Sequence, residues 1–475
     1  MSTHLPPSPS LEQLKKQAKT LLRHHGQSDA QTFERIRKFH PQLSGASDVD
    51  IAAAEFGLQD AQLLLAREYG FDSWPKMAAV LKIGAGELPP ARTDGDQIPN
   101  PYIIGAPVGN RHRQVFFGRE SDFAAIRKRL LAQESGSVTF LVGQARRIGK
   151  TSMLLQIANG RLGREILPVF VDMQQLVEGG NREFFEGMTR LIADSCELPQ
   201  RYDFSSGNPA ITFDRVLADA QRAVPEKRLL LLFDEIPILV NKVEKGELDE
   251  AVLTYLLSTV ESRGVSFIFT NVGVDGSVNG ATGAEGEWRG FAERAECRVI
   301  NFLSKEDTLR LVREPVQDRF EHESETLEGV YELSGGHPYY TQLICSCMVD
   351  YLNQPGRSAP PTPDDLAAVV DAIVDNPPPQ LVNAWSLTEG EQMALRLMGG
   401  AIEHPGEAVS LGTLGAALSP SRSSDGAGPQ DLQAALDALR ERELVGGEAD
   451  GYCFSVDLLR RWIRRGLAAG AGGVS

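Results

Sequence analysis

The sequence has little cysteine for its length, with five in 475 residues, and it contains no CxxC pair. This scarcity argues against a disulfide framework and against a cysteine-based zinc site, and favours buried free thiols. No apolar run approaches the roughly 20 residues that a membrane-spanning helix needs. The first residues also lack a basic segment leading into an apolar one, so no secretion signal is predicted. We therefore expect a cytoplasmic chain with no membrane association.

An excess of positive charge is also missing, because 48 Lys and Arg face 64 Asp and Glu, for a net charge of −16. This balance argues against non-specific attraction of the whole molecule to DNA, RNA or anionic lipid, although it leaves local basic patches open. Hydrophobic residues make up 42% of the chain. A chain of this length and composition is long enough to bury several cores, so we expect more than one domain.

The first part of the chain, residues 9–84, has the periodicity of amphipathic helices. One helical stripe is formed by Leu11, Leu14, Ala18, Leu21 and Leu22, and residues 60–69 repeat the spacing. We expect a small all-α module, followed by a linker at 85–99 that is rich in Gly, Pro, Ala and Asp. The histidines of the module are expected on solvated faces rather than on a metal; they are His24, His25 and His40.

From residue 100 to 303, short apolar runs alternate with helical patterns, which predicts an α/β domain with a parallel sheet. The five predicted strands are 138–142, 167–171, 229–233, 265–270 and 298–302. A glycine-rich stretch between the last two, residues 273–290, predicts a mobile loop.

The C-terminal third is predicted to be mainly helical. A capping box at Ser304–Asp307 opens a helical lid over 304–375, with helices at 326–333 and after Pro338. Residues 380–466 contain three helical patterns followed by a hairpin pattern, which is the outline of a winged-helix domain; the helices are 388–398, 411–418 and 429–444, and the hairpin is 445–456. Residues 467–475 are expected to be a flexible tail.

The tripeptide Gly149-Lys150-Thr151 follows the first predicted strand and opens an apolar-periodic helix. The tripeptide alone occurs by chance in roughly a quarter of chains this long. Its position between strand and helix, however, is typical of a phosphate-binding loop, in which helix N–H groups and the lysine neutralise phosphate and the threonine hydroxyl ligates Mg²⁺. We predict binding of ATP or ADP with Mg²⁺; the contacting residues would be Gly143, Gln144, Ala145, Arg146, Arg147, Ile148, Gly149, Lys150, Thr151 and Ser152.

This loop departs from the strict pattern, which places glycine at position 144. The chain has Gln144 there and Gly143 one residue earlier. Either Gly143 makes the turn and Ala145 is accommodated as a bulge, or Gln144 takes the first position with a negative φ and the cradle is altered. A degenerate loop that holds nucleotide weakly or not at all is a third interpretation.

Polar residues end two of the predicted strands. Asp234 and Glu235 follow 229–233, where the first carboxylate would hold Mg²⁺ through water and the second would orient or deprotonate the attacking water. The predicted metal ligands are thus Thr151 and Asp234, and the predicted catalytic residues are Glu235 and Lys150. After the fourth strand, Asn271 is expected to sense the γ-phosphate, although any strand exit offers such residues and an Asp-Glu pair is by itself an ordinary one.

Several ordered motifs between residues 100 and 465 resemble those of STAND-type ATPases of the AAA superfamily, particularly prokaryotic proteins related to archaeal origin-recognition ATPases. The motifs are Asn100-Pro-Tyr, Gly105-Ala-Pro-Val108, Phe117-Gly-Arg-Glu120, Arg146-Arg-Ile-Gly-Lys-Thr-Ser152, Phe233-Asp-Glu235, Ser334-Gly-Gly-His-Pro-Tyr-Tyr340 and Asp457-Leu-Leu-Arg-Arg-Trp-Ile463.

The resemblance implies a nucleotide-dependent switch that opens and assembles with ATP, closes with ADP and hydrolyses slowly. It places Phe117, Gly118 and Arg119 beside the adenine, and it closes Pro338 of the lid over the base or sugar. From the residues alone, the first motif could equally approach a helix N-cap and the second could be a plain helix break. No arginine finger is evident beyond Arg146 and Arg147 of the loop itself.

Two further questions stay open at this stage. Residues 9–84 resemble the helical segment that precedes ankyrin repeats in some bacterial proteins, which implies protein binding or self-assembly; a mere packing module is the alternative. DNA binding is disfavoured because the third helix of the predicted winged helix carries four acids against two arginines. A DNA-associated ATPase remains an alternative function, through Arg460, Arg461, Arg464 and Arg465, as does a non-catalytic nucleotide-binding scaffold.

Overall fold

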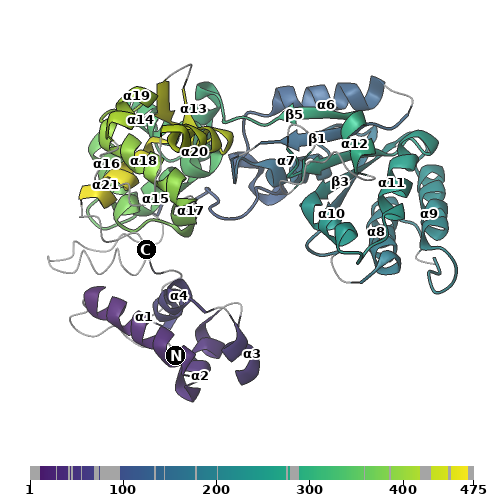
Figure 1. The fold of residues 1–475 in the computed structure, drawn as a ribbon, viewed down its shortest axis with the longest axis horizontal. Helices are drawn as coiled ribbons and strands as arrows, with labels where there is room; N and C mark the ends of the chain where they lie inside the picture. The colour runs from purple at the N-terminus through teal and green to yellow at the C-terminus, as the bar shows by residue number, and fades with distance from the viewer. Residues whose placement is uncertain are drawn as a thin grey trace. The chain divides into compact units, whose positions relative to one another are not determined.

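In a computed structural model, the chain forms two compact units, Met1–Gln97 and Ile98–Ser475 (Figure 1). The structure describes residues 11–27, 29–40, 43, 46–54, 56–68, 74, 97–132, 135–143, 145–176, 179–199, 202–273, 277–278, 288–357, 359–383, 387–417, 429–447 and 451–468. Most of the predicted linker, most of the glycine-rich stretch after the fourth strand and most of the predicted tail lie outside these residues.

The first unit is helical, as predicted, with its core on the expected stripe: Leu14, Ala18 and Leu21 are buried. Its helices are α1 (Leu11–Gly26), α2 (Ala30–Phe39), α3 (Asp48–Ala53) and α4 (Leu58–Glu68). The prediction of solvated histidines is wrong for His25 and His40, which are buried. His25 Nε2 lies 2.7 Å from the Ile51 carbonyl oxygen, and its ring stacks on Phe56. A buried hydrogen bond and ring stacking therefore hold this histidine in the core.

The second unit contains a five-stranded parallel sheet. Its strands, in the order β2-β3-β4-β1-β5, are β1 (Val138–Val142), β2 (Ile166–Asp172), β3 (Arg228–Asp234), β4 (Ser266–Thr270) and β5 (Ala295–Val299). Four predictions are confirmed within about one residue. The fifth strand begins three residues before its predicted start, because β5 is an edge strand whose first residues, Ala295 to Cys297, are not buried and form no apolar run. Ile300 follows the strand and still donates its N–H to the Val142 carbonyl of β1 at 2.7 Å.

Helices cover both faces of this sheet. One face packs against α6 (Glu120–Ala132) and α7 (Lys150–Ala158). The opposite face packs against helices that follow β2, β3 and β4: α8 (Asn181–Cys196), α9 (Pro209–Ala223), α10 (Ile236–Glu244), α11 (Ala251–Ser262) and α12 (Arg289–Arg294). Alternate strand residues point to the two faces, as the buried β1 pattern of Phe140 on one side and Leu141 on the other illustrates. The result is a three-layer α/β/α arrangement.

The remaining elements pack into one body with a continuous apolar core, here called the lid and C-terminal body (residues 304–468). A three-stranded antiparallel sheet in the order β6-β8-β7 lies within it. Its elements are α13 (Lys305–Arg313), η2 (Glu314–Val316), α14 (Ser324–Ser334), α15 (Pro338–Leu352), α16 (Pro363–Asp375), α17 (Pro379–Asn383), α18 (Glu389–Ala401), β6 (Val409–Ser410), α19 (Leu411–Ala417), α20 (Pro429–Glu441), β7 (Val445–Gly446), β8 (Gly451–Phe454) and α21 (Asp457–Ala468).

Residues 98–109 connect this body to the sheet domain. The Asn100 amide donates to the Ser346 backbone oxygen on α15 at 3.1 Å. At the other end, the Val108 N–H donates to Ser152 Oγ on α7 at 2.9 Å. The segment thus runs from the lid to the helix that follows the predicted phosphate loop.

Two smaller expectations can also be compared with the structure. None of the five cysteines forms a disulfide; Cys196 and Cys345 are buried, whereas Cys297 is exposed, against the expectation of burial, because it lies on the edge strand β5. Across the described residues, no helix is both long and apolar enough to cross a bilayer.

Candidate phosphate loop and carboxylate site

The loop between β1 and α7 ends in a helix N-terminus that no side chain caps. Gly149 at the N-cap has φ +103°, and no atom outside its neighbours lies within 4 Å of the position a Cβ would take. Only glycine adopts this conformation freely, so Gly149 allows the chain to turn directly into the first helical N–H groups, which no side chain caps. Such a terminus is suited to an anion.

The predicted extra residue, Gln144, lies outside the described residues. Its neighbour Gly143 does not have a positive φ, but a Cβ there would lie 3.0 Å from the Ile300 carbonyl oxygen. Gly143 is therefore needed for close packing rather than for a left-handed turn. Among the described loop residues, Gly149 and Arg147 are left-handed, the latter at φ +62°; Ala145 and Ile148 are buried.

Lys150 is the first residue of α7 and folds back over the loop. Its Nζ donates to the Gly143 carbonyl at 2.7 Å and to the Ala145 carbonyl at 3.5 Å. Burial lowers the pKa of Lys150, and the charges of Glu443, Glu235 and Asp234 oppose this shift. The ammonium group therefore lies within the field of three carboxylates and is held by backbone oxygens of the loop.

The carboxylates at the end of β3 are fixed by β4, which lies between β1 and β3 in the sheet. The Thr270 hydroxyl, fully buried, donates to Asp234 Oδ1 at 2.6 Å and accepts from the Glu235 N–H at 3.3 Å. The Thr270 hydroxyl thus contacts both Asp234, the predicted metal ligand, and Glu235, the residue predicted to act on the attacking water.

Glu235 adopts a left-handed conformation, with φ +58°, at the N-cap of α10. Burial raises the pKa of Glu235, and the neighbouring Asp234 charge raises it further, while a hydrogen bond with Asn271 and the charge of Lys150 act in the opposite direction. Asn271 is itself left-handed, at φ +61°. Strained backbone at both positions is common where side chains are aimed at a functional site.

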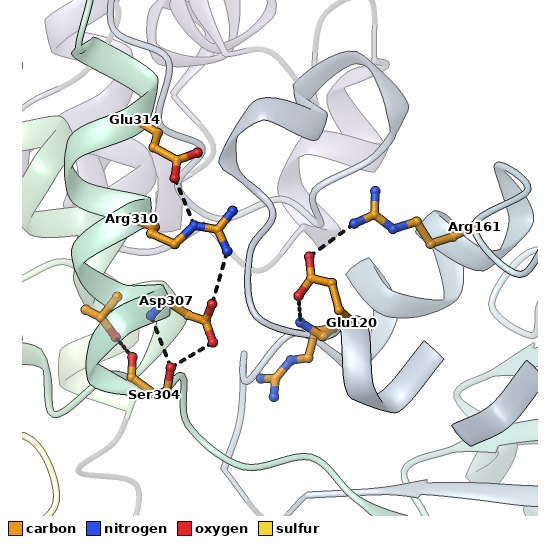
Figure 2. A network of polar contacts seen from close by, with 8 residues as sticks. Glu120, Arg161, Ser304, Asp307, Arg310 and Glu314 are labelled. Atoms are coloured by element: carbon orange, nitrogen blue, oxygen red, sulfur yellow. Dashed lines mark hydrogen bonds and ion pairs between the residues drawn. The ribbon is translucent and has the colours of Figure 1, made fainter. Parts of the chain in front are cut away.

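The predicted adenine-side residues lie against the first lid helix. Gly118 has φ +72°, and a Cβ there would lie 2.8 Å from the Asp307 carboxylate; the Arg310 guanidinium lies 5.1 Å from the centre of the Phe117 ring. Figure 2 shows Asp307, with Ser304 at the start of α13, and Arg310 on the helix that faces the segment of Glu120. Ser304 Oγ accepts from the Asp307 N–H at 3.1 Å, which confirms the predicted N-cap.

Arg119 is buried rather than displayed. Its guanidinium donates to the Ile148 carbonyl at 3.3 Å and to the Asn301 carbonyl at 2.7 Å. Burial lowers the pKa of Arg119, whereas the negative charges of Asp122, Asp307 and Glu120 raise it. Arg119 therefore joins the phosphate loop to the chain segment that leads from β5 into the lid.

The lid reaches the loop through His337, the N-cap of α15, which precedes Pro338. Its Nδ1 accepts from the Tyr339 N–H at 3.2 Å, so the ring proton is on Nε2, which lies 3.2 Å from the Arg146 carbonyl oxygen and donates to it. Burial lowers the pKa of His337 to about 4. Pro338 begins the helix as expected of a proline at N1, beside this contact.

The side chains of the two loop arginines are largely exposed. The Arg147 guanidinium lies 5.1 Å from the centre of the Tyr339 ring on α15. Ser152, also predicted to contact nucleotide, is buried, and its hydroxyl accepts from Val108 as described above.

Thus the structure brings Lys150, Asp234, Glu235 and Asn271 together at the carboxyl edge of the sheet, and places Phe117 and Gly118 against the lid. Sequence reasoning missed Glu443, whose Oε2 accepts from the Ala145 N–H at 3.2 Å. No local pattern marks Glu443, because 298 residues separate the two partners.

The donor set can be compared with what a magnesium ion needs. Among the described residues, no group of three or more His, Cys, Asp or Glu side chains is arranged to hold a metal ion. A magnesium ion in a nucleotide site takes few protein ligands, because water and phosphate supply the rest. Thr151, at the helix N-terminus, and Asp234, with an oxygen already fixed by Thr270, fit that sparser requirement.

No protein-family model and no curated protein sequence matches this chain. Among solved structures, the chain is similar to the Walker-type ATPase paby2304 of Pyrococcus abyssi, with 14% identity, a TM-score of 0.53, and 77% of this chain and 99% of that chain covered. It also matches the Aeropyrum pernix ORC2 protein in ADPNP-ADP complexes, with 15% identity, a TM-score of 0.48, and coverage of 77% and 97%. Together with the strand order and the loop, the first likeness shows that the chain has the α/β fold of P-loop NTPases.

Proposed function

We propose that this protein is a nucleotide-dependent switch of the STAND and AAA type, which binds ATP with Mg²⁺ at residues 143–152 and hydrolyses it slowly. The observation that carries the proposal is the convergence of Lys150 with Asp234 and Glu235 beside an uncapped helix N-terminus. A structural ion pair would explain the charges, but it would not explain a helix N-terminus that no side chain caps.

Each residue then has a chemical task. The N–H groups that begin α7 bind phosphate oxygens, and Lys150 exchanges its backbone partners for the β- and γ-phosphates. Thr151 and Asp234 would hold Mg²⁺, which supplies charge neutralisation of the phosphates when bound. Glu235 accepts a proton from, or orients, the attacking water, and Asn271 holds the Glu235 carboxylate near the γ-phosphate position.

Slow hydrolysis is supported by the distribution of arginines around the loop. Arg119, the buried arginine nearest the loop, is occupied by two backbone carbonyls. Arg146 and Arg147 belong to the loop itself and lie on its exposed side. Without an arginine aimed at the transition state, hydrolysis in P-loop enzymes is slower by roughly three to five powers of ten.

The domain division predicted from the sequence is part of the proposal. It comprises a helical module at 9–84, a linker at 85–99, a nucleotide domain at 100–303, a lid at 304–375, a winged-helix domain at 380–466 and a tail at 467–475. The helical module is proposed to bind a protein partner or a second copy of the chain. Three helices with a short antiparallel sheet in 388–456 are consistent with the winged helix.

The proposal is tested by the nucleotide content of the purified protein. After denaturation, mass spectrometry should find ATP or ADP with the wild type and none with Lys150→Ala. Size-exclusion chromatography in ATP and in ADP should then give different elution volumes for the wild type and identical ones for the variant. Wild-type protein that carries no nucleotide and elutes identically in both would overturn the switch.

The DNA-associated alternative has less support among the described residues. Arg440 stacks on Tyr452, with its guanidinium 4.7 Å from the ring centre, and Arg442 pairs with Glu391 at 2.9 Å. The arginines of α21 are likewise paired within the chain. A salt-sensitive retention on DNA that Arg461→Ala and Arg465→Ala abolish would favour the alternative.

A further inference from the structure

Glu443 lies just beyond α20, far from the nucleotide domain in sequence. Its backbone is left-handed, at φ +58°, as is common for a residue that follows the end of a helix. The turn is fixed by hydrogen bonds from the Glu443 N–H to Arg440 at 3.0 Å and from the Leu444 N–H to Leu439 at 3.1 Å. The helix end therefore fixes the backbone from which the Glu443 side chain extends.

The carboxylate of Glu443 reaches the phosphate loop. Glu443 Oε2 accepts a hydrogen bond from the Ala145 N–H at 3.2 Å. Among the charges that raise the pKa of Lys150, Glu443 acts most strongly, ahead of Glu235 and Asp234. Backbone N–H groups are what a phosphate loop offers to an anion, and the Glu443 carboxylate occupies one of them.

Glu443 does not reach the loop alone. His337 donates to the Arg146 carbonyl, and Tyr339 lies under the Arg147 guanidinium. Three consecutive loop residues, 145 to 147, are thus contacted by side chains of the lid and C-terminal body, which shares one apolar core. The contacts of His337 and Tyr339 involve a carbonyl and a side chain of the loop, whereas Glu443 accepts from a backbone N–H group of the loop.

We propose that Glu443 is an intramolecular competitor of the nucleotide's phosphates, and that nucleotide binding displaces its carboxylate from Ala145 and so loosens the C-terminal part from the loop. The inference rests on the proposed nucleotide binding and names the residue that couples binding to domain release. A glutamate at this position lowers the affinity for nucleotide, because part of the binding free energy is used to displace it.

The size of the effect follows from the type of contact. A hydrogen bond to a charged group contributes more than one between neutral groups, and repulsion between a carboxylate and phosphate adds to the competition. Removing the charge at 443 should therefore tighten nucleotide binding by roughly 10-fold. Since the contact is intramolecular, the gain is independent of protein concentration.

The test is a titration with a fluorescent ATP analogue in Mg²⁺ on the full chain. Glu443→Gln keeps the shape and removes the charge, and it should bind roughly 10-fold more tightly than the wild type. Glu441→Gln is the matched control, because Glu441 is exposed near the end of the same helix; it should bind within about twofold of the wild type. Glu443→Asn serves as a second variant, since asparagine tolerates the left-handed backbone and is too short to reach the loop.

The second readout is hydrogen exchange of the loop amides. In the wild type without nucleotide, the Ala145 amide should be protected. It should exchange at least several-fold faster in Glu443→Asn, whose side chain is too short to reach it, than in Glu443→Gln, which keeps an acceptor oxygen. If the wild type binds ATP and Lys150→Ala does not, but both Glu443 variants match Glu441→Gln in affinity, the competitor is refuted and the proposed function stands. If the wild type binds no ATP at all, the proposed function itself is refuted.

Discussion

Two basic clusters of this chain are used in opposite ways. On α21, Arg460 is buried and pairs with Asp457 at 2.5 Å, Arg464 donates to the Ile402 carbonyl at 2.7 Å, and Arg465 pairs with Asp375 at 3.0 Å. In the phosphate loop, Arg146 and Arg147 are exposed and Lys150 is held by backbone oxygens. The first cluster is neutralised by the fold, whereas the second keeps positive charge at a helix N-terminus. A count of basic residues does not separate the two; their partners do.

If the loop cluster serves catalysis, the carboxylates beside it must be chemically active. Replacing Glu235 with Gln should lower ATP hydrolysis by at least about 100-fold, because it removes the proton acceptor, and should leave ATP binding within about threefold. Phosphate release measures the first and a binding titration the second. Glu244→Gln, an exposed position at the end of the same helix, is the control. Unchanged hydrolysis in Glu235→Gln would favour the non-catalytic scaffold.

If the arginines of α21 stabilise the fold, replacing them should lower the free energy of unfolding. Arg460→Ala leaves a buried carboxylate with one fewer partner and orphans the Glu403 carbonyl, which accepts from Arg460 at 2.7 Å. We expect a loss of about 3 kcal/mol in the free energy of unfolding, measured with urea. Arg461→Ala, an exposed partner of the same Asp457, should cost about 1 kcal/mol or less. If both variants lose equally little unfolding free energy, the α21 arginines do not stabilise the fold, and a role in nucleic-acid binding is favoured.

The role of the carboxylate pair can also be tested through Thr270. Thr270→Val removes the hydroxyl that positions Asp234 and Glu235, and should lower hydrolysis by about 10-fold while costing roughly 1–3 kcal/mol of stability. Thr259→Val is the matched control, because Thr259 is equally buried and its hydroxyl donates only to Leu256 of its own helix, at 2.6 Å. The control should lose stability without losing activity. If Thr270→Val and Thr259→Val lose the same activity, Thr270 affects hydrolysis only by stabilising the fold.

The smallest expected effect is on pH dependence. His337 has its pKa lowered to about 4 from 6.5, so the unfolded chain takes up a proton that the folded chain refuses between these values. Its contribution is fully present above pH 6.5 and is lost as the pH falls toward 4. Between pH 7.5 and 5.5 this should cost about 1 kcal/mol in the wild type, and His337→Asn, which can still cap α15, should lose that part of the slope. The same slope in both proteins would contradict the buried neutral imidazole.

The strands, the loop and the carboxylate pair could be predicted because each is a local pattern: an apolar run of strand length, or a polar residue at its end. The predicted start of the fifth strand is wrong by three residues, because the apolar pattern marks the buried Ile300 just after the strand and not the partly exposed residues that begin this edge strand. The histidines of the first unit look polar in sequence, and only the packing of Phe56 on His25 shows otherwise.

The contacts that control the site were beyond sequence reasoning for a physical reason. The separation between Thr270 and Asp234 is 36 residues, between His337 and Arg146 it is 191, and between Glu443 and Ala145 it is 298. These pairs meet because β4 lies between β1 and β3 and because the lid packs on the loop. No periodicity or motif in the chain marks these long-range contacts.

The central claim is that the loop cluster binds nucleotide, and calorimetric titration with ATP and Mg²⁺ tests it most directly. The wild type should bind ATP with one site per chain, and Lys150→Ala should lose at least about 100-fold in affinity. Lys245→Ala should match the wild type, because Lys245 is exposed at the C-cap of α10, the opposite end of that helix from Glu235. Equal affinity in Lys150→Ala and Lys245→Ala, or no binding by the wild type, would contradict the account.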